Sequence, residues 1–517
     1  MTDFQKEQFL PVEADEEINQ SVEYLAQRQP VQPVTSKDIK ITPSNGGVFT
    51  KNSEFIEFRI NPQHNTFLDG SQTSLNFTFT AKAVAQADTT AFSVYAAGGA
   101  MSLFKRLQVT VGGYELENIT DHNRIYNILQ PLYTNTEQTS SSSAINDLFT
   151  PEYCPSGGGR LIQGDRSLES LTPAEFPIDI SVPLSLSSLF GPSARKAIPI
   201  GLMREAIMVR LYTVDTVHEA YYAQTGTLGT TTVIDPSSNF EIKNASLECK
   251  CIRFDDRTFE YIRNNVPENM LSWDACTYIC NNNNVAPQDA NVQVLLGNTN
   301  YTDVKSIIFG TRYSSAIDGK TLTYESVFPG LFRSNVLING QPVLARPLGV
   351  NNTTNLQAST PQMVTNLVSI ARNGLDIYES NTTLTGSGTQ GITGSYANQV
   401  NWFSPYANGG VVEATRFPAL GPSSIPNNQG PWPFTTLQSS GAPISPAFFV
   451  WGVSLLNSQD TSRQLVGRNL VSKQVVVEMV KHNQIPANSL TQVMMSVLSV
   501  GVKFHLDVKT GGLTRTL

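Results

Sequence analysis

The stretch that most constrains the fold is residues 178–214, IDISVPLSLSSLFGPSARKAIPIGLMREAIMVRLYTV. Apolar and polar residues alternate at its start and again after a turn-rich loop. Alternation with a period of two is the signature of a strand that turns one face to a core. The stretch therefore predicts two strands of a large β protein. Their apolar positions are Ile178, Ile180, Val182, Leu184 and Leu186, then Ile207, Val209 and Leu211.

Length and composition agree with this prediction. The chain has 517 residues, enough for two β domains of about 200 to 250 residues each. Only 15% of the residues are charged, while 36 Gly and 29 Pro punctuate the sequence, as many short strands and long loops require. The net charge of −8 argues against a broad phosphate-binding surface, so we expect no direct sequence-specific binding of nucleic acid.

No targeting or membrane segment is visible in the sequence. The first residues, MTDFQKEQFLPVEADEE, contain no cationic region followed by an apolar one. Nowhere do about 20 uninterrupted apolar residues occur, which is the length a membrane-spanning helix needs. We expect a soluble chain that is not secreted through a signal peptide.

Residues 1–37 are predicted to form an N-terminal arm. Residues 13–29 have the periodicity of a short amphipathic helix, and Pro30 and Pro33 stop it and favour an extended connector. Two interpretations remain open, because the helix either packs on its own domain or docks against a neighbouring subunit or a minor partner. Its apolar stripe consists of Ala14, Ile18, Val22 and Leu25.

The first domain is predicted to span residues 38–256. Residues 55–60 and 75–80 alternate around the turn signal FLDGSQ, which predicts a hairpin. A second hairpin is predicted around Gly112 and Gly113. After it, Asp121 is expected to cap a helix that runs to about residue 132.

The second domain is predicted to span residues 257–517. It follows a strand at 240–253 and begins with a short linking helix at 258–264. Asn339 and Gly340 give a hairpin signal, and a helix is predicted at 361–373. The strands expected in this domain are 271–279, 292–296, 304–313, 448–455, 465–480 and 493–508.

A long loop is predicted at about 379–442, where Gly, Ser, Thr, Asn and Pro replace strand periodicity. A loop of this length inside a compact domain is usually functional or disordered. It is interpreted either as a surface loop that carries recognition or as an irregular cover without a partner. Residues 134–175 and 215–238 are predicted to be shorter loops of the same kind.

Catalytic motifs are poorly supported, and we expect no enzyme activity, no catalytic residues and no cofactor. Residues 386–391, GSGTQG, match a dinucleotide fingerprint in letters, but no strand precedes them and no helix follows. Asp255 and Asp256 are interpreted as a solvated or capping pair. The five histidines show no metal-ligand or triad spacing: His64, His122, His218, His482 and His505.

The cysteines provide the one candidate metal site. Cys249 and Cys251 share a face of one predicted strand, and Cys276 and Cys280 share a face of another. Four thiols would suit tetrahedral zinc, or a disulfide could form, if these strands were neighbours. Reduced thiols in the core are the simpler interpretation, because free cysteine is among the most buried residue types. No metal site is therefore predicted.

Several segments resemble one protein family. FIEFRINPQHNTFLDGSQTSLNFTFTAK, MSLFKRLQVTVGGYELENITDHNRIYNIL and residues 178–214 are similar, in the same order, to the first half of major capsid proteins of the Polinton-like virus, virophage and adenovirus-type lineage. DVKSIIFGTR resembles a strand of their second half. The resemblance implies an all-β fold of two consecutive eight-stranded jelly rolls, with short flanking helices and long surface loops.

The resemblance also implies a function. Such a chain forms homotrimers of pseudo-hexagonal outline that tile the icosahedral shell of a double-stranded DNA virus. The implied partners are neighbouring capsomers, penton and minor capsid proteins, and host surfaces reached through loops; the implied location is the virion, assembled inside the host cell.

Two alternatives remain. One is a viral penton or spike protein. The other is a carbohydrate-binding or carbohydrate-active β-sandwich, which needs convergent carboxylates beside aromatic platforms. The four tryptophans, Trp273, Trp402, Trp432 and Trp451, show little such clustering except near the 402–432 loop.

Overall fold

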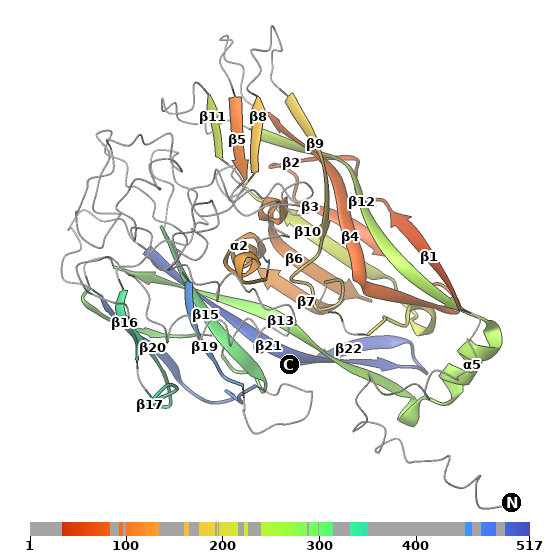
Figure 1. Cartoon of the computed structure of the whole chain (residues 1–517). Coiled ribbons are helices and arrows are strands. Elements are labelled where there is room, and N and C mark those ends of the chain that lie inside the picture. Colours follow the sequence, from red (N-terminus) through yellow and green to blue (C-terminus); the bar gives the residue numbers. More distant parts are fainter. Residues whose placement is uncertain are drawn as a thin grey trace, which may run out of the picture.

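The computed structural model of the chain shows two β-sandwiches that lie side by side, with helix α2 between them (Figure 1). It describes residues 34–82, 92–96, 100–133, 160–164, 175–191, 194, 196–215, 222–225, 239–286, 289–297, 299–313, 331–345, 347–349, 450–456, 467–481 and 492–517.

The first sandwich consists of two antiparallel sheets, here called A and B. Its core contains side chains from both sheets, and the rings of Phe77 and Phe104 meet across it with centroids 6.0 Å apart. Sheet A has the order β1 (Val34–Ile41), β12 (Asn239–Phe254), β4 (Thr66–Lys82), β9 (Glu175–Pro183), with β2 (Val48–Thr50) also on β12. Sheet B has the order β3 (Phe55–Ile60), β10 (Ile207–Thr213), β6 (Phe104–Val111), β7 (Tyr114–Thr120).

The second sandwich consists of sheets D and E. Trp451 joins them, because its indole is fully buried against Phe309 and its Nε1 donates a hydrogen bond of 3.2 Å to Ser334 Oγ on the facing sheet. Sheet D has the order β13 (Met270–Val285), β21 (Gln492–Asp507), β15 (Val304–Tyr313), β19 (Val450–Ser454), with β22 (Gly512–Thr516) also on β21. Sheet E has the order β14 (Asn291–Leu295), β20 (Val475–Lys481), β16 (Leu331–Ile338), β17 (Gln341–Pro342), with β18 (Leu348–Gly349) also on β16.

The two sandwiches repeat one strand order. In each half of the chain, the first strand of sheet A or D pairs with the last long strand of that half. These pairs are β1 with β12 in sheet A and β13 with β21 in sheet D. The next two positions are filled by β4 and β9 in one half and by β15 and β19 in the other. Every described strand pairing stays within residues 34–254 or within residues 270–516. A topology is therefore duplicated without a visible sequence repeat.

Short helices flank the sheets. The predicted helix after Asp121 is α2 (His122–Tyr133), and the predicted linking helix is α5 (Asp256–Asn264). Asp255 caps α5 by accepting a hydrogen bond of 2.9 Å from Thr258 N, as the capping interpretation expected. Short 3₁₀ turns add η2 (Ala100–Leu103), η3 (Ile200–Leu202) and η5 (Pro267–Asn269). In the described ranges, no helix has the length and apolarity that a membrane span needs.

The two glycine-containing hairpins at 107–119 and 331–342 are confirmed. Gly112 and Gly113 have φ values of 56° and 83°, and Asn339 and Gly340 have 50° and 77°. A two-residue turn with both φ values positive matches the twist of the strands it joins.

The hairpin predicted around FLDGSQ is wrong. Thr66–Lys82 is one strand, and β3 and β4 belong to different sheets. The register of β4 against β12 shifts between Asp69 and Ser74, so the turn-forming residues make a bulge inside the strand. Gly70 is required for another reason, because a Cβ there would lie 1.8 Å from the backbone oxygen of Leu189.

Three strand boundaries also differ from the prediction. The strand that begins the 178–214 stretch ends at Pro183, after which residues 184–191 turn across the sandwich; Gly191 lies so close to this turn that a Cβ would be 2.5 Å from Ser187 O. The strand predicted at 465–480 starts only at Val475. β1 begins at Val34, before the strands were expected to start.

Residues 134–175 and 215–238 are not loops throughout. Short strands from both of them pair with β5 (Phe92–Ala96) in a three-stranded sheet, sheet C, that stands at the top of Figure 1. These strands are β8 (Arg160–Gly164) and β11 (Tyr222–Thr225). Neither is long enough to show periodicity, so only their pairing reveals them.

Some predictions concern residues outside the described ranges. They are the helices at 13–29 and 361–373, the loop at about 379–442, and the fingerprint-like sequence at 386–391.

Candidate functional site at the junction of the two sandwiches

The two sandwiches contact each other where β7 of sheet B lies against β13 and β22 of sheet D. Backbone groups carry part of this contact. Arg515 Nη1 donates a 2.6 Å hydrogen bond to Leu116 O, and Arg204 N donates one of 3.1 Å to Gly511 O. Any function that requires the two sandwiches to keep a fixed relative orientation depends on this junction.

Glu117 is a fully buried carboxyl group at the junction. Its Oε1 accepts hydrogen bonds from Ser188 N at 2.7 Å and from Thr277 Oγ1 at 3.3 Å, and its Oε2 accepts one from Ser187 Oγ at 2.7 Å. One carboxyl group thus joins β7, the segment after β9, and β13 of the other sandwich. Burial raises the pKa of Glu117, while the hydrogen bonds from Ser187 and Ser188 and the charge of Arg515 oppose that shift.

The sequence predicts that Glu117 lies in a strand but does not reveal that it is buried. In the register of β7 against β6, Glu117 lies opposite the buried Val109 and Ile119 lies opposite the buried Leu107. Alternation therefore places Glu117 on the inward face beside Ile119, where its polar side chain alone would not predict burial. The neighbouring SLSS sequence, residues 185–188, was interpreted as strand alternation, whereas the structure makes it a turn whose hydroxyl and N–H groups face Glu117. The turn at 184–191 and β13 of the second sandwich together enclose the carboxyl.

A second polar contact lies at the start of α2. Asn282 Nδ2 of β13 donates a 2.7 Å hydrogen bond to Asp121 Oδ2, and Asp121 also pairs with Arg124 one turn later. Asp121 has a φ of 54°, a conformation that Asp tolerates better than most residues. The residue predicted as a helix cap therefore also contacts the second sandwich.

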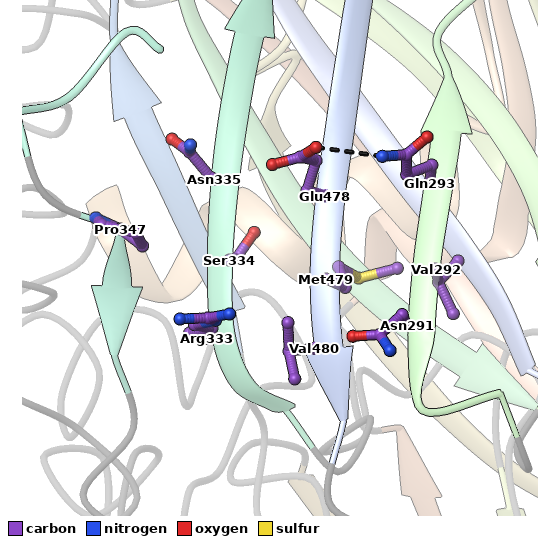
Figure 2. A pocket seen from close by; sticks show the side chains of 10 residues that line it. All are labelled: Asn291, Val292, Gln293, Arg333, Ser334, Asn335, Pro347, Glu478, Met479 and Val480. Carbon is purple, nitrogen blue, oxygen red and sulfur yellow. Dashed lines mark hydrogen bonds between the residues drawn. The ribbon is translucent and has the colours of Figure 1, made fainter.

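The outward face of sheet E has a concavity with a volume of about 410 Å³. Figure 2 shows that β14, β20 and β16 supply its floor, and that Gln293 and Glu478 point toward each other across it. Gln293 Nε2 donates a 3.0 Å hydrogen bond to Glu478 Oε1. Arg333, Asn335 and Asn291 add polar groups, while neighbouring Leu295 is 57% exposed.

Comparison with known proteins adds to this geometry. No protein-family model matches the chain, and no curated protein matches its sequence. Solved structures do match. A chain of the Sputnik virophage structure aligns with a TM-score of 0.52 and 13% identity over 97% of this chain and 92% of that one. The Faustovirus major capsid protein aligns with a TM-score of 0.51 and 12% identity over 97% and 94%.

The mavirus major capsid protein gives a similar result, with a TM-score of 0.50 and 10% identity over 98% of this chain and 95% of that one. Alignment over nearly the whole length includes both sandwiches and their order. The chain has the double jelly-roll fold. The predicted all-β class and the two consecutive jelly rolls are thereby confirmed.

The double jelly roll separates the four cysteines considered for zinc. Cys249 and Cys251 lie on β12 in sheet A, and Cys276 and Cys280 lie on β13 in sheet D. Burial raises the pKa of the Cys249 thiol to about 12 and also raises those of Cys251 and Cys280. All four are free thiols. Within the described ranges, no three His, Cys, Asp or Glu side chains group closely enough to hold a metal ion.

The described histidines and tryptophans are spread over both jelly rolls: His64 is exposed, with Nε2 3.9 Å from Asp256, and His505 contacts Ser272 and Thr516 on the surface of sheet D. His122 is buried with Nδ1 3.2 Å from Phe104 O, and burial lowers its pKa to about 4, so it is neutral at physiological pH. Trp273 and Trp451 are buried in the second jelly roll and offer no platform for a sugar ring. Trp402 and Trp432 lie outside the described residues.

Proposed function

We propose that this protein is a viral major capsid protein whose trimers form the capsomers of an icosahedral shell. The observation that carries the proposal is the duplicated strand order within one chain, together with a fold likeness to viral major capsid proteins over nearly its full length. Two similar sandwiches in each chain give a trimer six roughly equivalent sides. One kind of subunit then packs hexagonally.

The proposed role is structural rather than catalytic. Glu117 is fully buried and bonded to Ser187, Ser188 and Thr277, and His122 is buried and neutral. The proposed location is the virion, with assembly inside the host cell. Two jelly rolls in one chain favour a shell protein over a single-barrel penton or spike.

The proposed partners are two further copies of the chain, neighbouring capsomers, and penton and minor capsid proteins. Residues 1–33 precede β1, whose Val34 is in register with Phe254 directly before the capping residue of α5. The arm therefore starts at the α5 end of the first jelly roll. We propose that its predicted apolar stripe is buried between subunits, and that the loop at about 379–442 lies on the outer surface of the capsomer.

The test is the size and outline of the purified full-length chain. Light scattering is expected to give three times 56.5 kDa, and negative-stain microscopy is expected to show hexagonal particles. Protein that is monomeric at micromolar concentration would contradict the proposal. A chain that lacks residues 1–30 is expected to remain trimeric but to form shells poorly, and normal shells from it would remove the arm from the proposal.

A further inference from the structure

Glu117 is held by groups whose hydrogen positions are partly fixed by their other bonds. Ser187 Oγ accepts hydrogen bonds from Leu189 N at 3.3 Å and Phe190 N at 3.1 Å, so its own hydrogen is left to point at Glu117 Oε2. Ser188 N is an obligatory donor to Oε1. The remaining contact, from Oε1 to Thr277 Oγ1, is the one that crosses to the second jelly roll, and a hydroxyl serves there as donor or acceptor.

We propose that Glu117 binds and releases a proton at the junction, and that this proton controls how tightly the two jelly rolls are held together. With the proton absent, Thr277 donates its hydrogen to Oε1 and a negative charge is enclosed between the halves. With the proton present on Oε1, it is donated to Thr277 Oγ1, and the enclosed group is neutral. The proton comes from solvent and no covalent bond other than O–H changes.

The charged groups around Glu117 already have partners. Arg515 of β22 donates to Leu116 O and lies 4.0 Å from Glu115 Oε1, and Glu115 also lies 3.8 Å from Arg106 of β6. Asp121, at the start of α2, is paired with Arg124.

The remaining neighbouring segments add no balancing charge. On β13, Asp274 lies on the face opposite to Thr277, because side chains alternate along a strand. The turn at 184–191 carries no ionisable side chain. A charge that appears on Glu117 is therefore incompletely balanced.

The direction of the effect follows from burial. Burial raises the pKa of Glu117 above its ordinary value of about 4.5, so the folded protein prefers the protonated group. A group of this kind contributes stability that is fully present below its ordinary pKa and is lost as the pH rises through its raised value. The junction is expected to be tightest in acid and to weaken with rising pH.

Thermal unfolding of the full chain at a series of pH values tests the proposal. The unfolding temperature of the wild type is expected to fall, relative to that of Glu117→Gln, as the pH rises from about 5 to about 9, because only the wild type acquires the buried charge. The matched control is Glu115→Gln, which changes a partly exposed carboxyl two residues away on the same strand. Two results would overturn the proposal. One is a difference in unfolding temperature between Glu117→Gln and the wild type that does not change with pH. The other is a difference between Glu115→Gln and the wild type that changes with pH as much as the Glu117→Gln difference does.

Hydrogen exchange of the wild type alone provides a second test, which holds even if Glu117→Gln fails to fold. After correction for the intrinsic pH dependence of exchange, peptides from β7, β13 and β22 are expected to lose protection with rising pH while peptides from sheet A keep theirs. Loss that is uniform across the chain, or no loss, would contradict the proposal. Neither test depends on the capsid function, since both concern the contact between two halves of one chain.

Discussion

Sheets B and E hold the same position in the two jelly rolls, and their outward faces use polar side chains differently. On sheet B the side chains form a connected network: Glu57 accepts from Arg210 at 2.7 Å and from Ser44 at 2.8 Å, and Gln108 links Tyr212 to Glu115. Arg210 also lies over the ring of Phe55, and Arg106 over that of Tyr212.

The outward face of sheet E is open instead. Figure 2 shows Gln293 bonded to Glu478 above a concavity, and Leu295 on the same strand is largely exposed. The comparison teaches that a shared strand order fixes which residues are buried, because alternation assigns each side chain to a face. It does not fix what the outward side chains do. The following predictions test how far the likeness between the two jelly rolls extends.

The largest effects are expected in the two cores. Phe104→Ala in the first jelly roll and Trp451→Ala in the second are each expected to lower the free energy of unfolding by about 3–5 kcal/mol, because both side chains are fully buried and join the two sheets of their sandwich. Chemical denaturation measures the loss, and hydrogen exchange shows where it acts. Protection lost only in the altered half would mean that the halves unfold separately, whereas equal loss in both would mean that they unfold together.

Two buried glycines offer the next comparison. Gly70→Ala is expected to cost about 1–3 kcal/mol or more, because its Cβ would meet a backbone oxygen that cannot turn aside. Gly501→Ala is expected to cost less, because the atom its Cβ would meet is the end of the Asp303 side chain. Gly47→Ala, which meets nothing within 4 Å, is the control. Thermal unfolding ranks the three, and a Gly70→Ala protein as stable as Gly47→Ala would refute the close approach.

A smaller effect is expected from the network on sheet B. The pKa of Glu57 lies below its ordinary value. Burial raises this pKa, but the hydrogen bonds from Arg210 and Ser44 and the charges of Arg210 and Arg59 outweigh burial and lower it. A lowered pKa gives stability that is present above the ordinary value of about 4.5 and lost as the pH falls through the folded value, which is the opposite sign to Glu117.

Arg210→Ala is therefore expected to cost at most about 1 kcal/mol at neutral pH, because the pair is partly exposed. The cost is expected to shrink in acid, and unfolding curves at two pH values measure it. A cost that grows in acid would show that the network is not held by the ionised carboxylate.

The smallest effect is expected on sheet E. Gln293→Ala removes the bond to Glu478 on an exposed face and is expected to change stability by less than about 0.5 kcal/mol. Chemical denaturation of this variant beside Arg210→Ala compares the two outward faces directly. Equal losses in the two variants would mean that the faces are alike in energy despite their different bonding.

Much of the fold follows from the sequence. Strict alternation at 178–182 and 207–211, the two-residue turns at Gly112–Gly113 and Asn339–Gly340, and the cap at Asp255 are all local, and each has one favourable backbone solution. The double jelly-roll fold was implied by the resemblance of several segments, in their order, to major capsid proteins. The domain boundary at residues 256 and 257 remains a prediction.

The tertiary structure alone decided the rest, because the missing information is not local. A glycine next to Asp and Ser is a turn signal in any sequence, and only the backbone of Leu189 crossing β4 explains why Gly70 belongs to a strand. Nothing local in the sequence marks Glu117 as buried; its carboxyl is enclosed where the turn at 184–191 and β13, which are distant in the sequence, meet it. Composition and alternation predicted a mostly β protein with two large cores. Contacts between segments distant in the sequence determined that Glu117 is buried and that the outward face of sheet E is exposed.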